Sequence, residues 1–253
     1  MNKENNIKDW YLENFNQFNK VVSDDIFKSL RKEASAKFEN SDFPTKKDEE
    51  WKYTSISPIL NHEFTPSPLF MGDKEVLPII DKYLIKDLEV HLLVFVNGIF
   101  NKELSKIGEV ENGIIIDNLY NLSKNNPEFI SEHLSTKNDT NNSFNFLNNV
   151  FTYDGFVVYI PKNKVIEKPI HVLNIASNIN KPLVQPRNIV IAEANTEANI
   201  ITEYVGTEKS EYFTNILTDI SVDENSHITF FKLQNESNAA YHIDKTEIIQ
   251  KAS

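Results

Sequence analysis

The first forty residues carry apolar side chains at the spacing of two amphipathic helices. The apolar stripe of the first helix consists of Ile7, Trp10, Tyr11, Phe15, Phe18 and Val22. The stripe of the second consists of Phe27, Leu30, Ala34 and Phe38, and Pro44 ends the helical region. We expect Ser23 to cap the second helix, with Asp24 and Asp25 beside its positive N-terminal end. Two such helices bury too little surface to fold alone, so they should dock on the rest of the protein.

Two short strands are expected in the middle of the chain. The segment Leu88 to Gly98 is apolar and favours a strand, and Asn97-Gly98 predicts a tight turn into Ile99-Phe100. Ile114 to Ile116 predicts a second short, buried strand.

A more helical stretch follows from Leu119 to Leu134, and it is interrupted at Asn125-Asn126-Pro127. The polar segment Ser135 to Ser143 then predicts a loop at a domain boundary. The expected organisation has a helical N-terminal region over 1–60, a mixed α/β region over 61–142 and a β-helix over 143–253.

After Phe151 the pattern changes to short β-branched runs separated by polar, asparagine-rich corners. The expected strands are Phe156–Ile160, Ile170–Ala176, Asn188–Ala192, Asn199–Val205, Thr214–Val222, His227–Leu233 and Ile243–Ile249. Most of them alternate between two faces, as half-buried strands do. Asparagine tolerates the left-handed turn conformation, so it can form these corners where glycine is scarce.

Two architectures fit this succession of strands, and periodicity alone does not separate them. An antiparallel sandwich would need hairpin turns, yet after residue 150 the only Asp-Gly or Asn-Gly pair is Asp154-Gly155. A right-handed parallel β-helix needs only short corners and stacks each coil on the last, so we favour it. The predicted fold is therefore mixed and mainly β, with N-terminal helices followed by this β-helix. We expect the β-helix to be incomplete at its C-terminus, because the chain stops soon after Ile248-Ile249 without a capping helix. A final coil without a cap should associate with other molecules.

Composition excludes several classes of protein. The 253 residues carry a formal net charge of -11, and Lys and Arg are scattered among acids, which argues against a nucleic-acid partner. There is no cysteine, hence no disulfide framework and no thiolate for zinc or an iron–sulfur cluster. The N-terminal segment has no apolar signal region, and the apolar runs are too short to cross a membrane. These features predict a soluble cytoplasmic protein.

No self-contained active site is evident in the sequence. Six histidines are present, at positions 62, 91, 133, 171, 227 and 242, and no two lie within one helical turn of each other. His171 and His227 each begin a strand, and we interpret His171 as a packed or surface residue. The adjacent acids Asp24-Asp25 and Glu49-Glu50 read as solvated charges. The sequence thus predicts no catalytic, cofactor-binding or metal-binding residue.

Three segments in order resemble the SufB/SufD family of iron–sulfur cluster assembly scaffolds. Asp48 to Thr54 (DEEWKYT) is similar to the E-x-W-K/R-Y-T signature near the front of SufD-type proteins. Asp154 to Pro161 (DGFVVYIP), followed by Glu167 to Val172 (EKPIHV), resembles the family's entry into its β-helix. Pro186 to Asn195 (PRNIVIAEAN), with Glu203 to Gly206 (EYVG) downstream, resembles a later coil. Their order and spacing cover nearly the whole chain.

The resemblance implies helices at the N-terminus, a right-handed parallel β-helix and a non-enzymatic scaffold function. It also implies a SufBCD complex, with a SufB-type paralogue and a SufC-type ATPase as partners. A SufD-type subunit is favoured over SufB, because the cluster-bearing cysteine belongs to the SufB side. Family members continue past the position of Ser253, and most of the residues for cluster assembly and for ATPase docking are expected in that part. No catalytic residue is therefore transferred to this chain.

A few residues of the matched segments were candidates for a role beyond packing. Trp51, Lys52, Tyr53 and Thr54 form the signature, and we interpret its aromatic pair as a packing anchor. Arg187 and Asn188 are polar residues at the opening of a strand and are retained as weak candidates.

Two other function classes remain open on sequence alone. A carbohydrate-active β-helix enzyme would need clustered acids and bases on one strand face, and Glu193, Glu203, Asp219 and Lys232 form no obvious row. The other alternative is a protein-interaction module without chemistry.

Overall fold

The structure is a computed structural model that describes residues 3–22, 25–66, 73–134, 142–177 and 180–251. The two predicted N-terminal helices are present, as α1 (Lys3–Val21) and α2 (Lys28–Asn40). Ser23 and Asp24 lie outside the described residues, so the expected cap is not seen. Asp25 does accept a hydrogen bond from the backbone N–H of Phe27 at 3.0 Å, just before α2 begins.

A buried ion pair connects the beginning of α2 to the protein. The guanidinium of Arg31 contacts both carboxylate oxygens of Asp25, at 2.8 and 3.1 Å, and donates to the carbonyl of Thr152 at 3.0 Å. The side chain of Arg31 is fully buried and that of Asp25 is 2% exposed. The interpretation of Asp25 as a solvated charge was therefore wrong, because its partner Arg31 lies six residues further along the chain, on α2.

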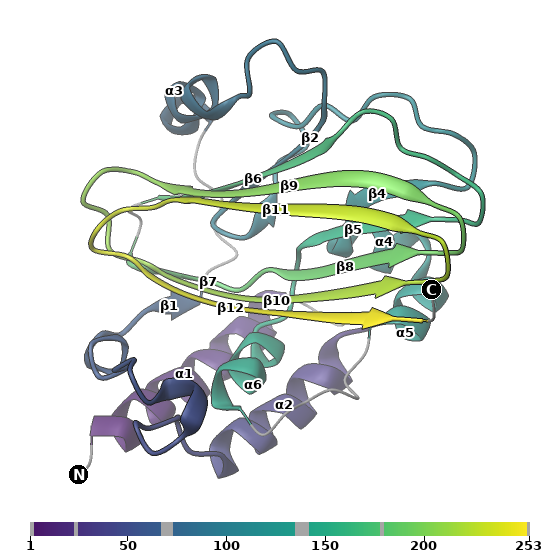
Figure 1. The fold of residues 1–253 in the computed structure, drawn as a ribbon. Helices are drawn as coiled ribbons and strands as arrows, with labels where there is room; N and C mark the ends of the chain where they lie inside the picture. Colours follow the sequence, from purple (N-terminus) through teal and green to yellow (C-terminus); the bar gives the residue numbers. More distant parts are fainter. Residues whose placement is uncertain (1–2, 23–24, 67–72, 135–141, 178–179, 252–253) are drawn as a thin grey trace.

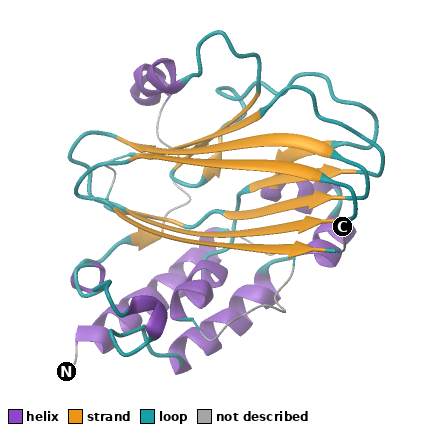
Figure 2. Ribbon diagram, viewed as in Figure 1, coloured by secondary structure: helices purple, strands orange, loops and turns teal. Residues whose placement is uncertain are grey.

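A third helix, α6 (Ser143–Val150), packs with α1 and α2 beneath the strands (Figures 1 and 2). All eight of its residues are buried. It joins an aromatic cluster in which Phe144 contacts Phe43, Trp51 and Phe213. We did not predict this helix, because it begins at the last residue of the polar segment assigned to a loop, and its polar face of Asn145, Asn148 and Asn149 is buried in the structure. The loop predicted over 135–143 falls mostly outside the described residues, and Ser143 already belongs to α6.

The strands of the described residues form two sheets that face each other (Figure 1). The seven-stranded sheet contains β1 (Thr65–Pro66), β4 (Ile115–Asn118), β5 (Phe156–Ile160), β7 (Pro182–Val184), β8 (Arg187–Ala192), β10 (Phe213–Val222) and β12 (Tyr241–Gln250). The five-stranded sheet contains β2 (His91–Val96), β3 (Ile99–Phe100), β6 (Ile170–Ala176), β9 (Glu197–Gly206) and β11 (His227–Asn235).

From β5 onward the chain forms a parallel β-solenoid. It passes from one sheet to the other in each coil: β5 to β6, β8 to β9, β10 to β11, and then β12. Val157 pairs with Ile189, Ile189 with Asp219 and Asp219 with Glu247, so one coil takes about thirty residues, within the usual range of repeat proteins. All pairings among these strands are parallel. The preference for a β-helix over an antiparallel sandwich is confirmed.

The corners use the residue types that the sequence indicated. Asn163, Asn195 and Asn225 adopt the left-handed conformation, with φ between 54° and 64°. Asn97 and Gly98 also have positive φ, 51° and 79°, and form the predicted tight turn between the antiparallel strands β2 and β3.

Further helices cover the ends and faces of the sheets. The helical stretch after residue 119 consists of α4 (Leu119–Asn125) and α5 (Pro127–His133), and it breaks at the expected proline. The helix α3 (Asp73–Tyr83) packs on the outer face of the five-stranded sheet, and short 3₁₀ turns occur at Glu49–Trp51 and Ile59–Asn61. None of the helices in the described ranges combines the length and apolar character needed to cross a lipid bilayer.

Candidate functional site

The interior of the solenoid, between the two sheets, is apolar at one end and polar at the other. The apolar end is filled by inward-facing side chains of successive coils, among them Val158, Val190, Ile200 and Ile220. At the other end the inward positions carry hydroxyl, amide and charged groups. A polar half inside a solenoid is costly unless its members are paired, so it is the first place to look for a function.

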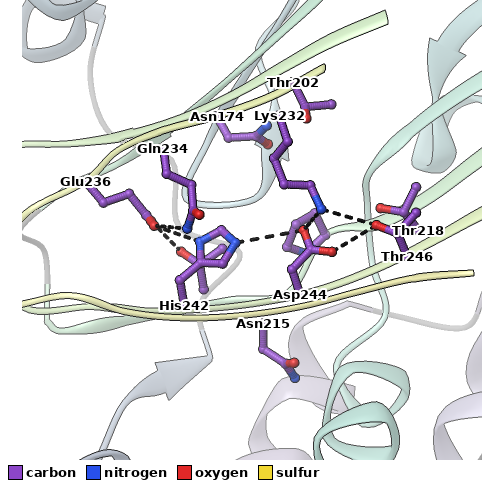
Figure 3. A network of polar contacts seen from close by, with 12 residues as sticks. Asn174, Thr202, Asn215, Thr218, Lys232, Gln234, Glu236, His242, Asp244 and Thr246 are labelled. Atoms are coloured by element: carbon purple, nitrogen blue, oxygen red, sulfur yellow. Dashed lines mark hydrogen bonds and ion pairs between the residues drawn. The ribbon is translucent and has the colours of Figure 1, made fainter. Parts of the chain in front are cut away.

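The charged part of this interior lies between β11 and β12 (Figure 3). The ammonium of Lys232 on β11 lies 2.6 Å from a carboxylate oxygen of Asp244 on β12 and donates to the hydroxyl of Thr246 at 3.2 Å. His242 lies 2.7 Å from Glu236, which follows β11, and 3.8 Å from Asp244. We call these four charged residues, Lys232, Glu236, His242 and Asp244, the interior network. It joins β11 and β12, the last two strands in the described part of the solenoid, across the interior.

The protonation states in the interior network follow from its pairing. Burial alone would lower the pKa of His242, but the carboxylates of Asp244 and Glu236 outweigh burial and raise it to about 8. Burial likewise acts to raise the pKa of Asp244, but His242 and Lys232 hold it below its ordinary value. At neutral pH His242 is therefore mainly protonated and Asp244 is ionised.

Uncharged groups extend the polar interior toward the earlier coils. Asn188 on β8 accepts a hydrogen bond from the backbone N–H of Phe156 at 3.2 Å and donates to the hydroxyl of Thr218 at 3.1 Å. The ring of Tyr204 meets that of His242 edge to face, with centroids 5.1 Å apart. Burial raises the pKa of Tyr204 far above its ordinary value, so it stays a neutral phenol. These groups connect three coils by side-chain contacts.

Sequence reasoning did not find the interior network, although a signal for it exists. In β11 and β12, Lys232 and Asp244 occupy the same alternate positions as apolar residues such as Phe230 and Ile248, which face inward. Charged residues on the apolar face of a predicted strand indicate a buried polar contact. The sequence does not give the register between coils, so it could not show which of these charged residues contact one another.

The two polar candidates at the start of β8 point to opposite sides of the sheet. Asn188 faces inward, as described above, whereas Arg187 faces outward and forms an ion pair with Asp219. Arg187 is 4% exposed and Asn188 is 2% exposed, so both residues are buried. Their roles seen here are structural contacts between neighbouring coils.

His171 is packed rather than exposed. Its Nε2 lies 3.2 Å from a carboxylate oxygen of Glu203 on the outer face of the five-stranded sheet, and both side chains are nearly inaccessible. Asn235 donates to the other oxygen of Glu203 at 3.0 Å. No group of three metal-ligating side chains was found among the residues that the structure describes.

The four signature residues, Trp51 to Thr54, lie in different surroundings and do not form a single packed group. Trp51 packs on Phe144 of α6, with ring centroids 5.6 Å apart, as a packing anchor should. Tyr53 is 91% exposed, so it is not part of that anchor. Trp51 and Thr54 help to line a groove of about 1250 Å³ between segment 40–59 and the start of β12, whereas Lys52 lies over the ring of Tyr53.

The Asp154-Gly155 pair has a clear structural role. The carboxylate of Asp154 accepts hydrogen bonds from the N–H groups of Phe100, Tyr120 and Gly155 and from the side chain of Asn118, at 2.9 to 3.1 Å. Burial raises the pKa of Asp154 to about 6, although these four donors act in the opposite direction. This carboxylate connects β3, β4 and α4 to the first strand of the solenoid.

The four charged strand residues considered for a carbohydrate-active enzyme lie on more than one face. Glu203 lies on the outer face of the five-stranded sheet, and Lys232 faces the interior. Asp219 lies on the outer face of the seven-stranded sheet, where it lines a groove together with Glu193.

Comparison with known proteins identifies two family regions in order along the chain. Residues 1–172 match the SufBD protein N-terminal region, and residues 174–253 match the SufBD core domain of the SUF system for iron–sulfur cluster assembly. The boundary between them falls within β6.

Two curated relatives agree with this match. The chain is 30% identical to the iron–sulfur cluster assembly SufBD family protein slr0076 of Synechocystis, over 90% of this chain and 52% of that protein. It is 24% identical to the chloroplastic protein ABCI7 of Arabidopsis thaliana, over 83% of this chain and 44% of that protein. The chain thus spans about half the length of the curated relatives that it matches. With both family regions matched in sequence and a β-solenoid observed in the structure, the chain belongs to the SufBD family of the SUF iron–sulfur cluster assembly system.

Proposed function

We propose that the protein is a non-catalytic, SufD-type scaffold subunit that acts with a SufB-type paralogue and a SufC-type ATPase during iron–sulfur cluster assembly. The observation that carries this proposal is the match of both family regions, in order, across the chain. The assembly role printed for the Synechocystis relative agrees with it.

The absence of cysteine supports the SufD-type assignment. The nascent cluster is the cargo of such a complex, and its usual protein ligands are thiolates, of which this sequence has none. Any thiolate ligand of the cluster must therefore come from outside residues 1–253, and in this proposal the SufB-type partner supplies it while this chain contributes a rigid solenoid and its surfaces.

Co-purification tests the proposal. The tagged chain is expressed with the SufB-type and SufC-type proteins of the same source, each alone and both together, and eluted complexes are analysed for subunit composition, iron and sulfide. We expect capture of the SufB-type protein and iron and sulfide only in preparations that contain it. By the family resemblance, the ATPase docking surface lies mostly beyond residue 253, so the ATPase is scored separately.

Two results would contradict the proposal. One is stoichiometric iron and sulfide on the isolated chain after anaerobic reconstitution. The other is failure to retain the SufB-type protein although the chain is folded by circular dichroism.

A further inference from the structure

A small groove lies on the outer face of the seven-stranded sheet, where α5 lies beside the ends of β8, β10 and β12 (Figure 1). Its volume is about 260 Å³. Pockets for small molecules usually measure about 300 to 1,000 Å³, so this groove is better sized for one or two side chains.

The floor of the groove is formed by two rows of residues in register across the three strands. One row runs from Ile191 on β8 through Ser221 on β10 to Ile249 on β12. Ile249 is 48% exposed, an unusual exposure for isoleucine on a sheet face. The other row runs from Ile189 on β8 through Asp219 on β10 to Glu247 on β12. A row with two isoleucines and a row that ends in two acids therefore lie side by side.

Further acids surround this floor. Glu132 comes from α5, Glu193 follows β8 and Asp223 follows β10. Their cationic contacts are limited: Lys251 lies 3.0 Å from Asp223, Lys245 lies 3.8 Å from Glu247, and Arg187 pairs with Asp219.

Glu193 is held by neutral donors, the hydroxyl of Tyr159 at 2.7 Å and the backbone N–H of Lys162 at 2.9 Å. His133 also lines the groove and stacks on Tyr159. Over the part of the chain that the structure describes, five carboxylates thus lie near three cations and one histidine at this groove, so acids outnumber bases there.

We propose that this groove binds an arginine side chain presented by a protein partner. An arginine has an apolar stem of three methylene groups and a planar cationic head, so it matches an apolar strip beside carboxylates. Its stem would lie along Ile191 and Ile249, and its guanidinium would reach Glu132, Glu193 or Glu247. Arginine is preferred over lysine because its fork can form two parallel hydrogen bonds to one carboxylate. This inference does not rest on the scaffold function proposed above, because it concerns binding of a side chain by this chain alone.

Titration with short peptides tests this site. Three blocked pentapeptides that differ only in the central residue, which is arginine, lysine or norleucine, are added to the ¹⁵N-labelled chain. We expect saturable shifts of the amide signals of Ile191, Ser221 and Ile249 with the arginine peptide. The lysine peptide should bind several-fold more weakly, and norleucine should leave these signals in place.

Paired variants separate the groove from general attraction by an acidic protein. In Glu132→Gln/Glu247→Gln we expect the dissociation constant of the arginine peptide to rise about tenfold. The control Glu103→Gln/Glu109→Gln, which neutralises two exposed acids elsewhere, should leave it unchanged. The proposal fails if the groove signals do not shift, if norleucine shifts them as much as arginine, or if both variant pairs weaken binding equally.

Discussion

At the scale of single residues, the backbone of Gly155 lies very close to the backbone of Arg187 in the next coil. A Cβ atom placed there would lie 2.1 Å from the carbonyl oxygen of Arg187 and 2.8 Å from its nitrogen. The first strand of the solenoid can therefore meet the next coil only if residue 155 has no side chain. This steric requirement explains the glycine of the Asp-Gly pair, and the four donors around Asp154 explain the aspartate.

Gly155→Ala should lower the free energy of unfolding by at least about 3 kcal/mol, since two backbones would have to separate. Denaturant unfolding followed by circular dichroism measures the loss. The control is Gly108→Ala, where the nearest atom, in the ring of His91, is 3.6 Å from the added carbon. Equal losses in both variants would show that the close approach at Gly155 is not the cause.

The buried pair of Arg31 and Asp25 makes a second prediction at this scale. Arg31→Met should cost about 3 to 5 kcal/mol, because it leaves the buried carboxylate of Asp25 without its cation. The double variant Arg31→Met/Asp25→Asn should recover much of that loss, since no uncompensated charge remains. Chemical denaturation of both variants and of Asp25→Asn completes the double-mutant cycle, and strict additivity of the two single changes would refute the pairing.

The individual contacts of the interior were beyond prediction from the sequence. Alternation showed which residues of β11 and β12 share a face, but not which residue faces them from the neighbouring strand. Lys232 meets Asp244 only because β11 and β12 belong to opposite sheets and approach across the interior. The same reason applies to Arg31, whose burial depends on the distant carbonyl of Thr152.

At the scale of elements, the interior network acts as a pH-dependent connection between β11 and β12. The pKa of His242 is raised from 6.5 to about 8, so the folded state binds this proton more tightly than the unfolded state. Its stabilising contribution is full below pH 6.5 and is lost as the pH rises through about 8.

We expect the free energy of unfolding to fall by about 2 kcal/mol between pH 6 and 9 because of this group, as the rise of its pKa from 6.5 to about 8 implies. Asp154, whose pKa burial raises to about 6, titrates at the lower edge of this window, so a variant of His242 is needed to isolate the contribution of the histidine. Urea unfolding at a series of pH values provides the measurement. The variant His242→Gln should remove this part of the slope, and an unchanged slope in the variant would contradict the assignment.

The elements that the sequence predicted best are those with a strong local pattern. Strands such as Phe156–Ile160 and Ile170–Ala176 were expected at their observed bounds from their short β-branched runs, and both are buried along nearly their whole length. The short strand β7 was missed since it is bounded by Pro182 and Pro186, residues that usually argue against strands. Helix α3 was missed as well, and it contains Pro78 in its interior.

At the scale of the whole molecule, β11 leaves apolar groups in solvent. Within the described residues, β11 pairs only with β9, and Phe231 and Leu233 are 53% and 43% exposed on the outer face of the sheet. An edge strand with exposed apolar side chains is a surface for association.

The 253-residue polypeptide should therefore self-associate at micromolar concentration. Phe231→Lys/Leu233→Glu should shift it toward the monomer in sedimentation velocity, because charges on an edge strand oppose pairing with another copy. The comparison variant Val21→Lys alters an equally apolar residue, 67% exposed at the end of α1, and should leave the distribution as it was. A wild-type monomer at these concentrations would exclude the edge as an association surface.

The packing of α1 and α2 against α6 and β10 also has a consequence for synthesis on the ribosome. Tyr11 and Phe38 are among the first residues made, but their cluster is completed by Phe144, Leu147 and Phe213, more than a hundred residues later. Translation adds about 5 to 20 residues per second, so the apolar faces of the two helices remain without their final partners for roughly 10 to 40 seconds. During that interval the nascent chain presents two amphipathic helices to the surrounding solution. Early engagement by a chaperone, released once α6 and β10 have emerged, would protect them.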